Sequence, residues 1–439
     1  NPLARRDSLA DSKLTADTKS ERNQERPGKA KTTTTPTASW RNTFISLRHR
    51  DYLLFWLGML GIMAGMQMQM LARSYLVYDI TNSPAILGIV AAGSAVPMLG
   101  FSLFGGAFAD RFDRRRIIQA GQASFALLAL AVAIVIVTDR VTWVYLLIAA
   151  VIQGIAFSFM MPARQSIIPQ LVPREQITNA MALSSAAMSA MTLTAPAFAG
   201  LLYAFAGPET VYFIISGLGF GAIVFTSLIS LAGTDGARRK RGSVIKDVGA
   251  GLAYIKSNNI VLVLLIIGLA TSVLAQPFRM LMPLFIVDVY ELGPRAMGLL
   301  VSAMGGASLF GALFVASISN WRRGMLLLIG SFMSGIALVL IASVPIYYAA
   351  VLFMIPLGLG DAGRRTLNQS LVMEETDDEF RGRVMSVFML NRGMMPLGVL
   401  PTAIMAEYVG AQVAIGTLGV LLLGFTLVVT VTQKRLRDM

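Results

Sequence analysis

The sequence lacks cysteine altogether and contains a single histidine, His49. Without cysteine, the chain cannot form a disulfide, a thiolate metal site or a cysteine nucleophile. His49 precedes the first long apolar segment, so neither a histidine general base nor a histidine metal cluster can lie among the apolar segments. These absences exclude most hydrolase and redox chemistry, and we expect no enzyme, no metal and no cofactor.

Charged residues are also scarce: they make up 14% of the 439 residues, against 55% hydrophobic residues, and the mean hydropathy is +0.66. A soluble domain usually contains about a quarter charged residues. The apolar residues occur in runs of about 20 or more, the length that crosses a hydrocarbon core about 30 Å thick. We therefore predict an all-α membrane protein that crosses the bilayer many times.

About twelve segments have the length and hydropathy of a membrane helix. The expected spans are 53–78, 85–109, 117–138, 143–168, 178–206, 211–232, 259–287, 296–318, 324–343, 346–372, 383–407 and 411–432. The one long connection is a basic stretch, 233–258, which contains Arg238-Arg239-Lys240-Arg241. It divides the spans into an N-terminal six-helix bundle (45–232) and a C-terminal six-helix bundle (259–439), joined by a cytoplasmic linker.

Residues 1–44 form a polar segment rich in Thr, Lys, Arg, Asp and Ser. They include the run Thr32-Thr33-Thr34-Thr35-Pro36 and show no apolar period, so we expect a disordered cytoplasmic tail. The segment has no short apolar core followed by a cleavage site, so it is not a signal peptide. Because the first residue is Asn1, the sequence leaves open where the natural chain begins.

The net charge of +13 could suggest a nucleic-acid partner, but its distribution indicates membrane topology instead. If the N-terminus is inside, the predicted outer loops contain only Arg140 and Arg295, and the other loop arginines and lysines lie on the inner side. Lys and Arg accumulate in cytoplasmic loops. We therefore expect a multi-pass protein of the inner (plasma) membrane with both termini in the cytoplasm and no nucleic-acid partner.

The loop between the second and third spans carries a motif, Gly106-Ala107-Phe108-Ala109-Asp110-Arg111-Phe112-Asp113-Arg114-Arg115-Arg116. It resembles the signature G-x-x-x-D-R-x-G-R-R of the major facilitator transporters. The resemblance implies two bundles that expose a midplane site alternately to each side. It also implies a gating latch made by Gly106, Asp110, Arg111, Arg114 and Arg115. Asp110 would accept hydrogen bonds from a neighbouring helix N-terminus, and Arg114 would pair with a carboxylate across the bundle interface.

Asp113 stands where that family most often has glycine. This form resembles the drug-export and siderophore-export branch, as do Pro162-Ala163-Arg164-Gln165-Ser166 and Arg381-Gly382-Arg383-Val384-Met385-Ser386. A shift of 200 positions pairs Arg164 with Arg364 and Pro196 with Pro396, which supports two duplicated halves. In the second half, Asn320 occupies the position of Asp110, so we expect a one-sided latch.

The fifth span contains Pro196-Ala197-Phe198-Ala199-Gly200, which resembles the end of the antiporter signature G-P-x-x-x-G, with Ala195 replacing its first glycine. Proline and small residues allow a helix to bend and neighbours to approach closely. Pro196 and Gly200 therefore predict a helix bend. An ordinary packing kink explains this bend as well as an antiporter signature does, so the motif alone does not establish antiport.

Several ionisable or polar residues lie inside the predicted spans, where they are costly and mark functional sites by default. Gln69 and Arg73 continue a four-residue stripe begun by Gly61 and Gly65, and Gln276 shares a helical face with Arg279. The first and seventh spans are equivalent in this family and line its cavity. We therefore predict a substrate cavity lined by Gln69, Arg73, Gln276, Arg279, Asn391 and Arg392. Snorkelling of Arg73 to the interface is the alternative.

Asp361 is the one clear acidic residue inside a span, and Arg364 and Arg365 follow at the pairing positions i+3 and i+4. Neighbouring arginines favour the carboxylate form and burial favours the protonated form. The sequence therefore leaves two roles open, a structural ion pair or a proton-coupling residue.

These features favour a proton-coupled exporter of an amphiphilic, drug-like or siderophore-like molecule. Its cavity would be positive, apolar and rich in methionine, although methionine also fills ordinary helix interfaces. An importer on the same fold and a membrane sensor that has lost transport are the alternatives. No G-x-x-x-x-G-K-[ST] motif occurs, so the energy must come from an ion gradient or the solute's own gradient. Substrate identity and oligomeric state cannot be read from the sequence.

Overall fold

The computed structural model describes residues 44–109, 112–230, 252–317, 322–377, 379–394 and 396–438. The predicted tail except its last residue, most of the basic linker, and Asp110, Arg111 and Asn320 lie outside the described residues, as do the side chains of Gly106, Asn391 and Arg392. The predicted helices are present throughout the described ranges, which contain no strand.

The first half contains η1 (Ile45–Arg48), α3 (Arg50–Thr81), α4 (Pro84–Ala109), α5 (Arg114–Val137), α6 (Trp143–Leu171), η2 (Arg174–Gln176) and α7 (Ile177–Ser227). The second half contains α9 (Asn259–Leu274), α10 (Pro277–Met280), α11 (Met282–Leu284), η3 (Phe285–Val289), α12 (Pro294–Ser317), α13 (Arg323–Ser343), α14 (Tyr347–Glu374), α15 (Arg381–Gly393), α16 (Pro396–Val409), α17 (Ala411–Thr432) and α18 (Lys434–Asp438). These bounds follow the expected spans closely, with three exceptions.

The first exception is α7, which runs through the predicted fifth and sixth spans. It is interrupted by non-helical backbone at Gly207, where φ is 77° and ψ is 166°. Glycine adopts this positive φ readily, and the following Pro208 disfavours helical backbone at the residue before it. The connection between the two legs therefore needs only one residue with non-helical backbone, Gly207.

The other exceptions are predicted spans that the structure breaks. The stretch 259–287 is divided into α9, α10, α11 and the π-helical η3, and 383–407 is divided into α15 and α16. Proline lacks the backbone donor and clashes with the carbonyl four residues earlier. Pro277, Pro283 and Pro396 each lie at or near such a break. Each of these two expected spans is therefore built from shorter helical pieces in the structure.

Nine of the described helical segments are long and apolar enough to cross a membrane, by length and composition. One of them is 174–227, which contains the Gly207 interruption. α14 is not among the nine, and it carries Asp361, Arg364 and Arg365. The count of about twelve crossings stays a prediction.

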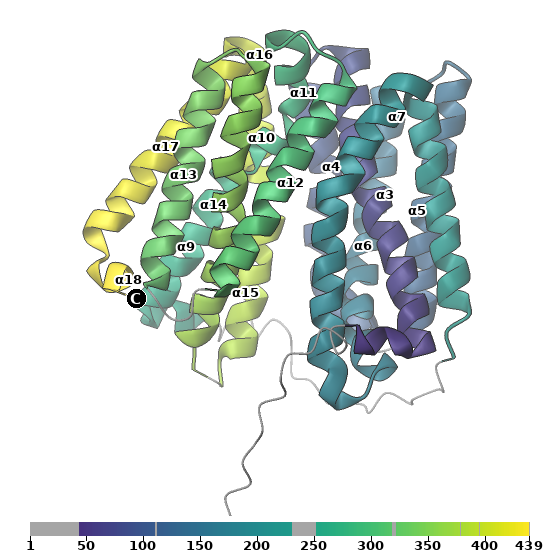
Figure 1. Cartoon of the computed structure of the whole chain (residues 1–439), viewed down its shortest axis with the longest axis horizontal. Coiled ribbons are helices and arrows are strands. Elements are labelled where there is room, and N and C mark those ends of the chain that lie inside the picture. Colours follow the sequence, from purple (N-terminus) through teal and green to yellow (C-terminus); the bar gives the residue numbers. More distant parts are fainter. Residues whose placement is uncertain are drawn as a thin grey trace, which may run out of the picture. The chain divides into compact units, whose positions relative to one another are not determined.

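The helices pack mainly with others of the same half, as the colours of Figure 1 allow the reader to follow. In the first half, α3 and α5 pack against α7, and α4 packs against α6. In the second half, α12 and α13 pack against α14, and α13 also packs against α17. The two halves meet chiefly where α7 packs against α12 and where α4 packs against α16. The division into two bundles is itself a prediction with which these contacts agree.

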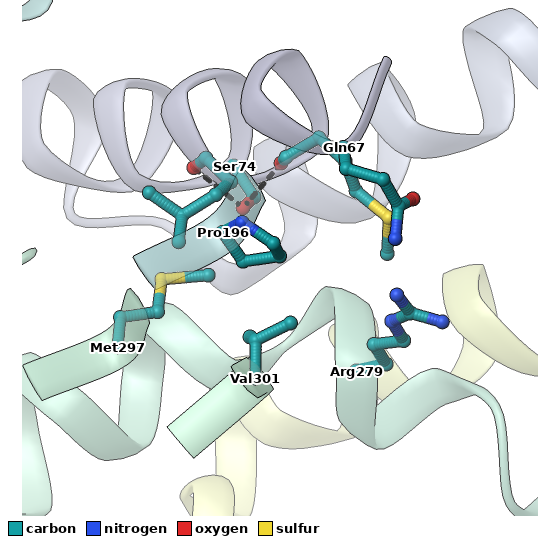
Figure 2. A pocket seen from close by; sticks show the side chains of 8 residues that line it. Gln67, Ser74, Pro196, Arg279, Met297 and Val301 are labelled. Carbon is teal, nitrogen blue, oxygen red and sulfur yellow. Dashed lines mark hydrogen bonds between the residues drawn. The ribbon is translucent and has the colours of Figure 1, made fainter. Parts of the chain in front are cut away.

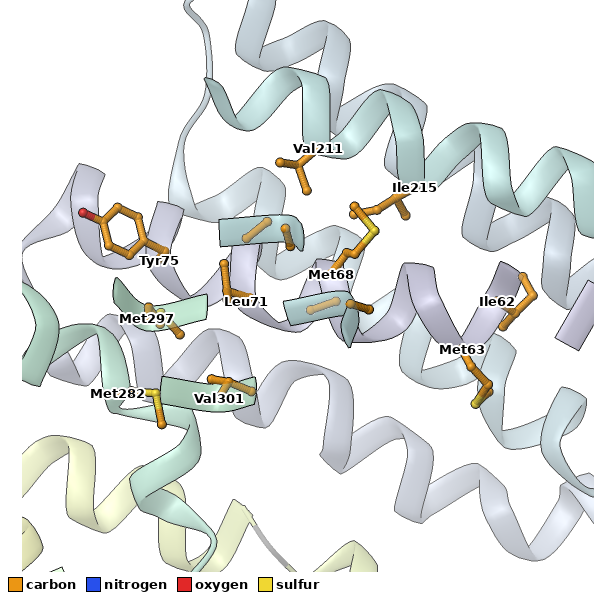
Figure 3. Close-up of a cluster of buried hydrophobic side chains, with 14 of the residues drawn as sticks. Ile62, Met63, Met68, Leu71, Tyr75, Val211, Ile215, Met282, Met297 and Val301 are labelled. Atoms are coloured by element: carbon orange, nitrogen blue, oxygen red, sulfur yellow. The ribbon is translucent and has the colours of Figure 1, made fainter. Parts of the chain in front are cut away.

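One buried apolar cluster continues from the first half into the second. It joins Leu71 of α3 to Met282 of α11 and to Met297 and Val301 of α12, which Figure 3 shows close together. A separate cluster lies among α9, α13, α14, α15 and α17 and includes Leu264, Leu327 and Leu371. An apolar core is therefore shared by the two halves where α3 meets α11 and α12.

Glycines let the backbones of the two halves touch in this shared region. A Cβ atom at Gly200 of α7 would lie 2.5 Å from the carbonyl oxygen of Pro294, and one at Gly298 of α12 would lie 2.7 Å from that of Pro196. At the other junction, a Cβ atom at Gly88 of α4 would lie 2.5 Å from the Cβ atom of Ala403. Because lipid tails are as apolar as the helices, such close van der Waals packing is a main source of association between membrane helices.

Hydrogen bonds reinforce the same end of the molecule. The Tyr78 hydroxyl donates to Asp288 of η3. Glu407 of α16 accepts from the Ser83 hydroxyl at 2.8 Å and from the Ala85 backbone N–H at 3.0 Å. The carboxylate thus caps the start of α4, where the helix dipole favours a negative charge. These hydrogen bonds therefore join the two halves at the end that we predict to be extracellular.

We predict that Gly200→Ala weakens the contact between α7 and α12, because the added methyl group overlaps the Pro294 carbonyl. Overpacking of this kind costs about 1–3 kcal/mol. Thermal unfolding in one detergent should show a lower midpoint for Gly200→Ala. The matched control is Gly217→Ala on the same helix, where nothing lies within 4 Å, and it should be neutral or slightly stabilising. Equal midpoints for the two variants would contradict the packing argument.

Candidate functional site

Asp361 lies at the centre of a buried polar cluster on α14. Only 1% of Asp361 and 3% of Arg364 is exposed. Arg364 donates to Asp361 Oδ1 at 2.7 Å, and Arg365 forms an ion pair with Oδ2. The second guanidinium nitrogen of Arg364 lies 3.3 Å from Ser334 Oγ on α13. The predicted ion pair is therefore present, and both carboxylate oxygens have partners.

The Asp361 cluster also reaches the broken helix of the second half. Gln276, which precedes α10, donates from its amide nitrogen to Asp361 Oδ1 at 3.1 Å. Helices α13 and α14 approach each other closely beside the cluster, since a Cβ atom at Gly360 would lie 2.3 Å from the Gly330 carbonyl oxygen. Asp361 thus links α13, α14 and the break between α9 and α10.

Gln69 and Arg73 lie in a hydrogen-bonded chain inside the first half. Arg73 donates to Gln153 Oε1 of α6 at 3.2 Å, and Gln153 Nε2 donates to Gln69 Oε1 at 2.6 Å. Their stripe on α3 continues through Gly65, which packs on Phe125 of α5. This stripe therefore faces helices of its own half, and the contact of Gln69 and Arg73 with substrate stays a prediction.

A different face of α3 borders a pocket between the two halves. The pocket is lined by Gln67, Met70, Leu71, Ser74, Pro196, Arg279, Met297 and Val301. Figure 2 shows the Arg279 guanidinium pointing from the second half toward Gln67 on α3. Of the predicted cavity residues whose side chains are described, only Arg279 lines this pocket.

Pro196 and Gly200, the predicted bend residues, lie where α7 crosses α12. Pro196 also forms part of the pocket wall. The Pro196 carbonyl also approaches Gly298 of α12, so the contact between α7 and α12 lies directly beside the pocket. The position of these residues therefore connects the helix contact to the pocket, whatever the local bend.

The described part of the gating motif anchors the start of α5. Asp113 caps this helix by accepting from the Arg115 backbone N–H at 2.9 Å, which gives a structural role to the residue that replaces glycine. Arg114 donates to the Ser166 carbonyl of α6 at 3.1 Å, and Arg115 donates to the Ser227 carbonyl of α7. These contacts stay within the first half, and a pair across the halves remains a prediction.

Sequence reasoning missed Gln67 and Gln153. Both are uncharged polar residues inside apolar spans, which was the available signal. Neither residue carries a charge, and neither lies on the stripe of Gly61, Gly65, Gln69 and Arg73. Gln67 lies two positions before Gln69, so the two side chains leave the helix on different faces.

Comparison with known proteins decides the family. The sequence profile of the Major Facilitator Superfamily matches residues 55–399. The chain belongs to the Major Facilitator Superfamily. It is therefore a multi-pass membrane transporter and not an enzyme of the classes considered above.

Similar curated proteins are named as exporters or siderophore transporters. The chain is 23% identical to macrolide efflux protein A of Streptococcus pyogenes, over 77% of this chain and 85% of that protein. It is 24% identical to the staphyloferrin A transporter of Staphylococcus aureus, over 88% and 95% respectively. It is also 24% identical to the enterobactin exporter EntS of Shigella boydii, over 75% and 76%. The resemblance to the exporter branch is thus confirmed at low identity.

Solved structures support the same fold. The nucleoside transporter NupG aligns with a TM-score of 0.69 and 14% identity, covering 89% of this chain and 99% of that one. At this identity the likeness concerns the fold alone. The Major Facilitator fold predicted from the sequence is confirmed, and the helix count is left as predicted.

We predict that Asp361→Asn destabilises the transporter, because it leaves Arg364 buried without a carboxylate. Removing one partner of a buried pair typically costs about 3–5 kcal/mol. Adding Arg364→Met to Asp361→Asn should recover part of this loss in thermal unfolding. The control is Arg435→Gln, which breaks a pair with Glu375 whose arginine side chain is 70% exposed and should change the midpoint little. A double variant no more stable than Asp361→Asn would contradict the ion-pair explanation.

Proposed function

We propose that this transporter is a proton-coupled exporter of an amphiphilic, drug-like or siderophore-like molecule in the inner (plasma) membrane. Both termini would be cytoplasmic. The predicted gating motif and the exporter names of the similar proteins support this direction of transport. The observation that carries the site is the pocket between the two halves, which combines an apolar wall with Arg279 and Gln67.

Alternating access is supported by the position of the contacts between halves. The Gly200–Gly298 and Gly88–Ala403 crossings and the Glu407 cap all lie toward the predicted outer end. Release of a substrate to the outside requires these contacts to separate. The described arrangement corresponds to the state in which the outer path is closed.

Import is the second candidate, because similar folds include a nucleoside transporter and the fold itself does not fix direction. Efflux from loaded proteoliposomes separates the two directions. The panel contains a macrolide, a cationic dye and a catecholate siderophore, each measured with and without a proton gradient. Faster loss of one compound only with the gradient supports coupled export, whereas uptake without efflux overturns it.

We expect that joining the two halves at the outer end stops export. Cysteines replacing Ser83 and Glu407 would lie where the two side chains now form a 2.8 Å hydrogen bond, in a chain with no other cysteine. A short cleavable cross-linker should inhibit efflux in Ser83→Cys/Glu407→Cys, and reduction should restore it. Each single variant, treated identically, serves as the control. Full efflux from the cross-linked protein would contradict alternating access at this end.

We also expect Asp361 to affect coupling, since it links α13, α14 and the break before α10. Asp361→Asn should abolish the substrate transport that a proton gradient drives. Exchange of substrate across the membrane without a gradient should continue. The exchange assay is the control for folding. Gradient-driven transport that remains complete and pH-dependent would remove Asp361 from the coupling role and leave it as a structural ion pair.

A further inference from the structure

Arg279 is a guanidinium without a described counter-charge. Its Nε atom is buried and has no hydrogen-bond partner. Among the described residues, Arg279 forms no ion pair and no side-chain hydrogen bond. Placing a charge at low dielectric without a partner is costly, and an anion nearby lowers that cost.

Two carboxylates of the second half, Asp361 and Asp288, are already engaged. Both oxygens of Asp361 have partners in Arg364, Arg365 and Gln276. Asp288, which follows Arg279 in the same broken helix, accepts from Tyr78. Neither of these carboxylates therefore neutralises Arg279 in this arrangement.

The opposite wall of the pocket offers one further free polar group. Gln67 of α3 lines the pocket, and its amide forms no hydrogen bond with another described residue. The Ser74 hydroxyl is not available in the same way, because it already donates to the carbonyls of Met70 and Leu71. Polar recognition in the pocket is thus limited to Arg279 and Gln67, which Figure 2 shows on facing sides.

The remaining lining is apolar: Met70, Leu71, Pro196, Met297 and Val301. Methionine packs adaptably against irregular apolar groups. A ligand that fits this lining therefore has an apolar body and one compact polar end. Because guanidinium binds carboxylates through parallel N–H bonds, the matching polar end is a planar anion.

We propose that Arg279 and Gln67 form a subsite for the single carboxylate of an amphiphilic ligand, held between the two halves of the transporter. Arg279 supplies the charge and N–H donors from the second half, and Gln67 supplies an amide donor from the first. Arg73 does not share this role, because it does not line the pocket and donates to Gln153 inside the first half. Charge selectivity is therefore concentrated in one arginine.

This subsite deepens the proposed function and rests on it only for the idea that the pocket holds a transported solute. Its ligand would contact both α3 and α10. Occupancy thereby favours the arrangement in which the halves lie close at the predicted outer end. Neutral molecules of the same shape would bind through the apolar wall alone and would be held less tightly.

The test is equilibrium binding to the purified full-length chain in lipid nanodiscs, measured by calorimetry without any gradient. The probes are three carboxylates of increasing apolar size, benzoate, naphthoate and naphthylacetate, each with its primary amide. Empty nanodiscs give the background. For the wild type, at least one carboxylate should bind about tenfold or more tightly than its amide, or about 1.4 kcal/mol.

Arg279→Gln should bring carboxylate affinity down to that of the amide and leave amide binding unchanged. Gln67→Leu should reduce the preference several-fold and not abolish it. The matched control is Arg164→Gln, which removes another arginine whose described hydrogen-bond partner is the Met63 sulfur, at 3.7 Å, in a separate pocket of the first half. It should keep the wild-type preference.

Equal binding of every carboxylate and its amide to the wild type, including no binding by either, overturns the subsite. A preference that survives in Arg279→Gln overturns it as well. Should Arg279→Gln fail to fold, the wild-type ratio and the Gln67→Leu variant still decide. If carboxylates bind more tightly than their amides but no efflux is seen, the export proposal is wrong and the subsite stands. If efflux is seen but carboxylates and amides bind equally, the subsite is wrong and the export proposal stands.

Discussion

Close backbone contact between α7 and α12 is the constraint on which the rest of the structure depends. In lipid, two apolar surfaces gain nothing by leaving the solvent, so helices associate where small residues let them touch. Gly200 and Gly298 provide that contact, and Gly88 provides its counterpart between α4 and α16. The pocket, the shared apolar core and the Glu407 cap all adjoin these crossings.

Charge compensation divides the buried polar groups into two kinds. Asp361, Arg364, Arg365 and Gln276 form a cluster in which both carboxylate oxygens are used, which fixes α14 against α13 and the broken helix. Arg279, only three residues from Gln276, receives no such compensation. A helix break places neighbouring residues in different environments because the side chains no longer follow one helical stripe. The Asp361 cluster links helices within the second half, whereas Arg279 faces the pocket between the halves.

Much of the fold followed from length and periodicity. Long apolar runs can only be helices in a bilayer, since each backbone polar group must be satisfied within its own segment. Breaks were harder to predict, because proline is tolerated in membrane helices when neighbours satisfy the freed groups: Pro97, Pro196 and Pro356 lie inside continuous helices. Pro277 and Pro283, only a few residues apart, instead divide their span into short pieces.

The sequence by itself determined that this is a helical membrane transporter of the Major Facilitator type, and the spacing of Arg364 and Arg365 after Asp361 placed all three where they could pair. Only the tertiary structure decided that Arg73 is bound by Gln153 while Arg279 faces Gln67. Local spacing fixes which residues share a helical face. Which neighbouring helix that face meets depends on packing between segments distant in sequence. Gln67 and Gln69 leave α3 on different faces, and packing brings the first to the pocket and the second to Gln153.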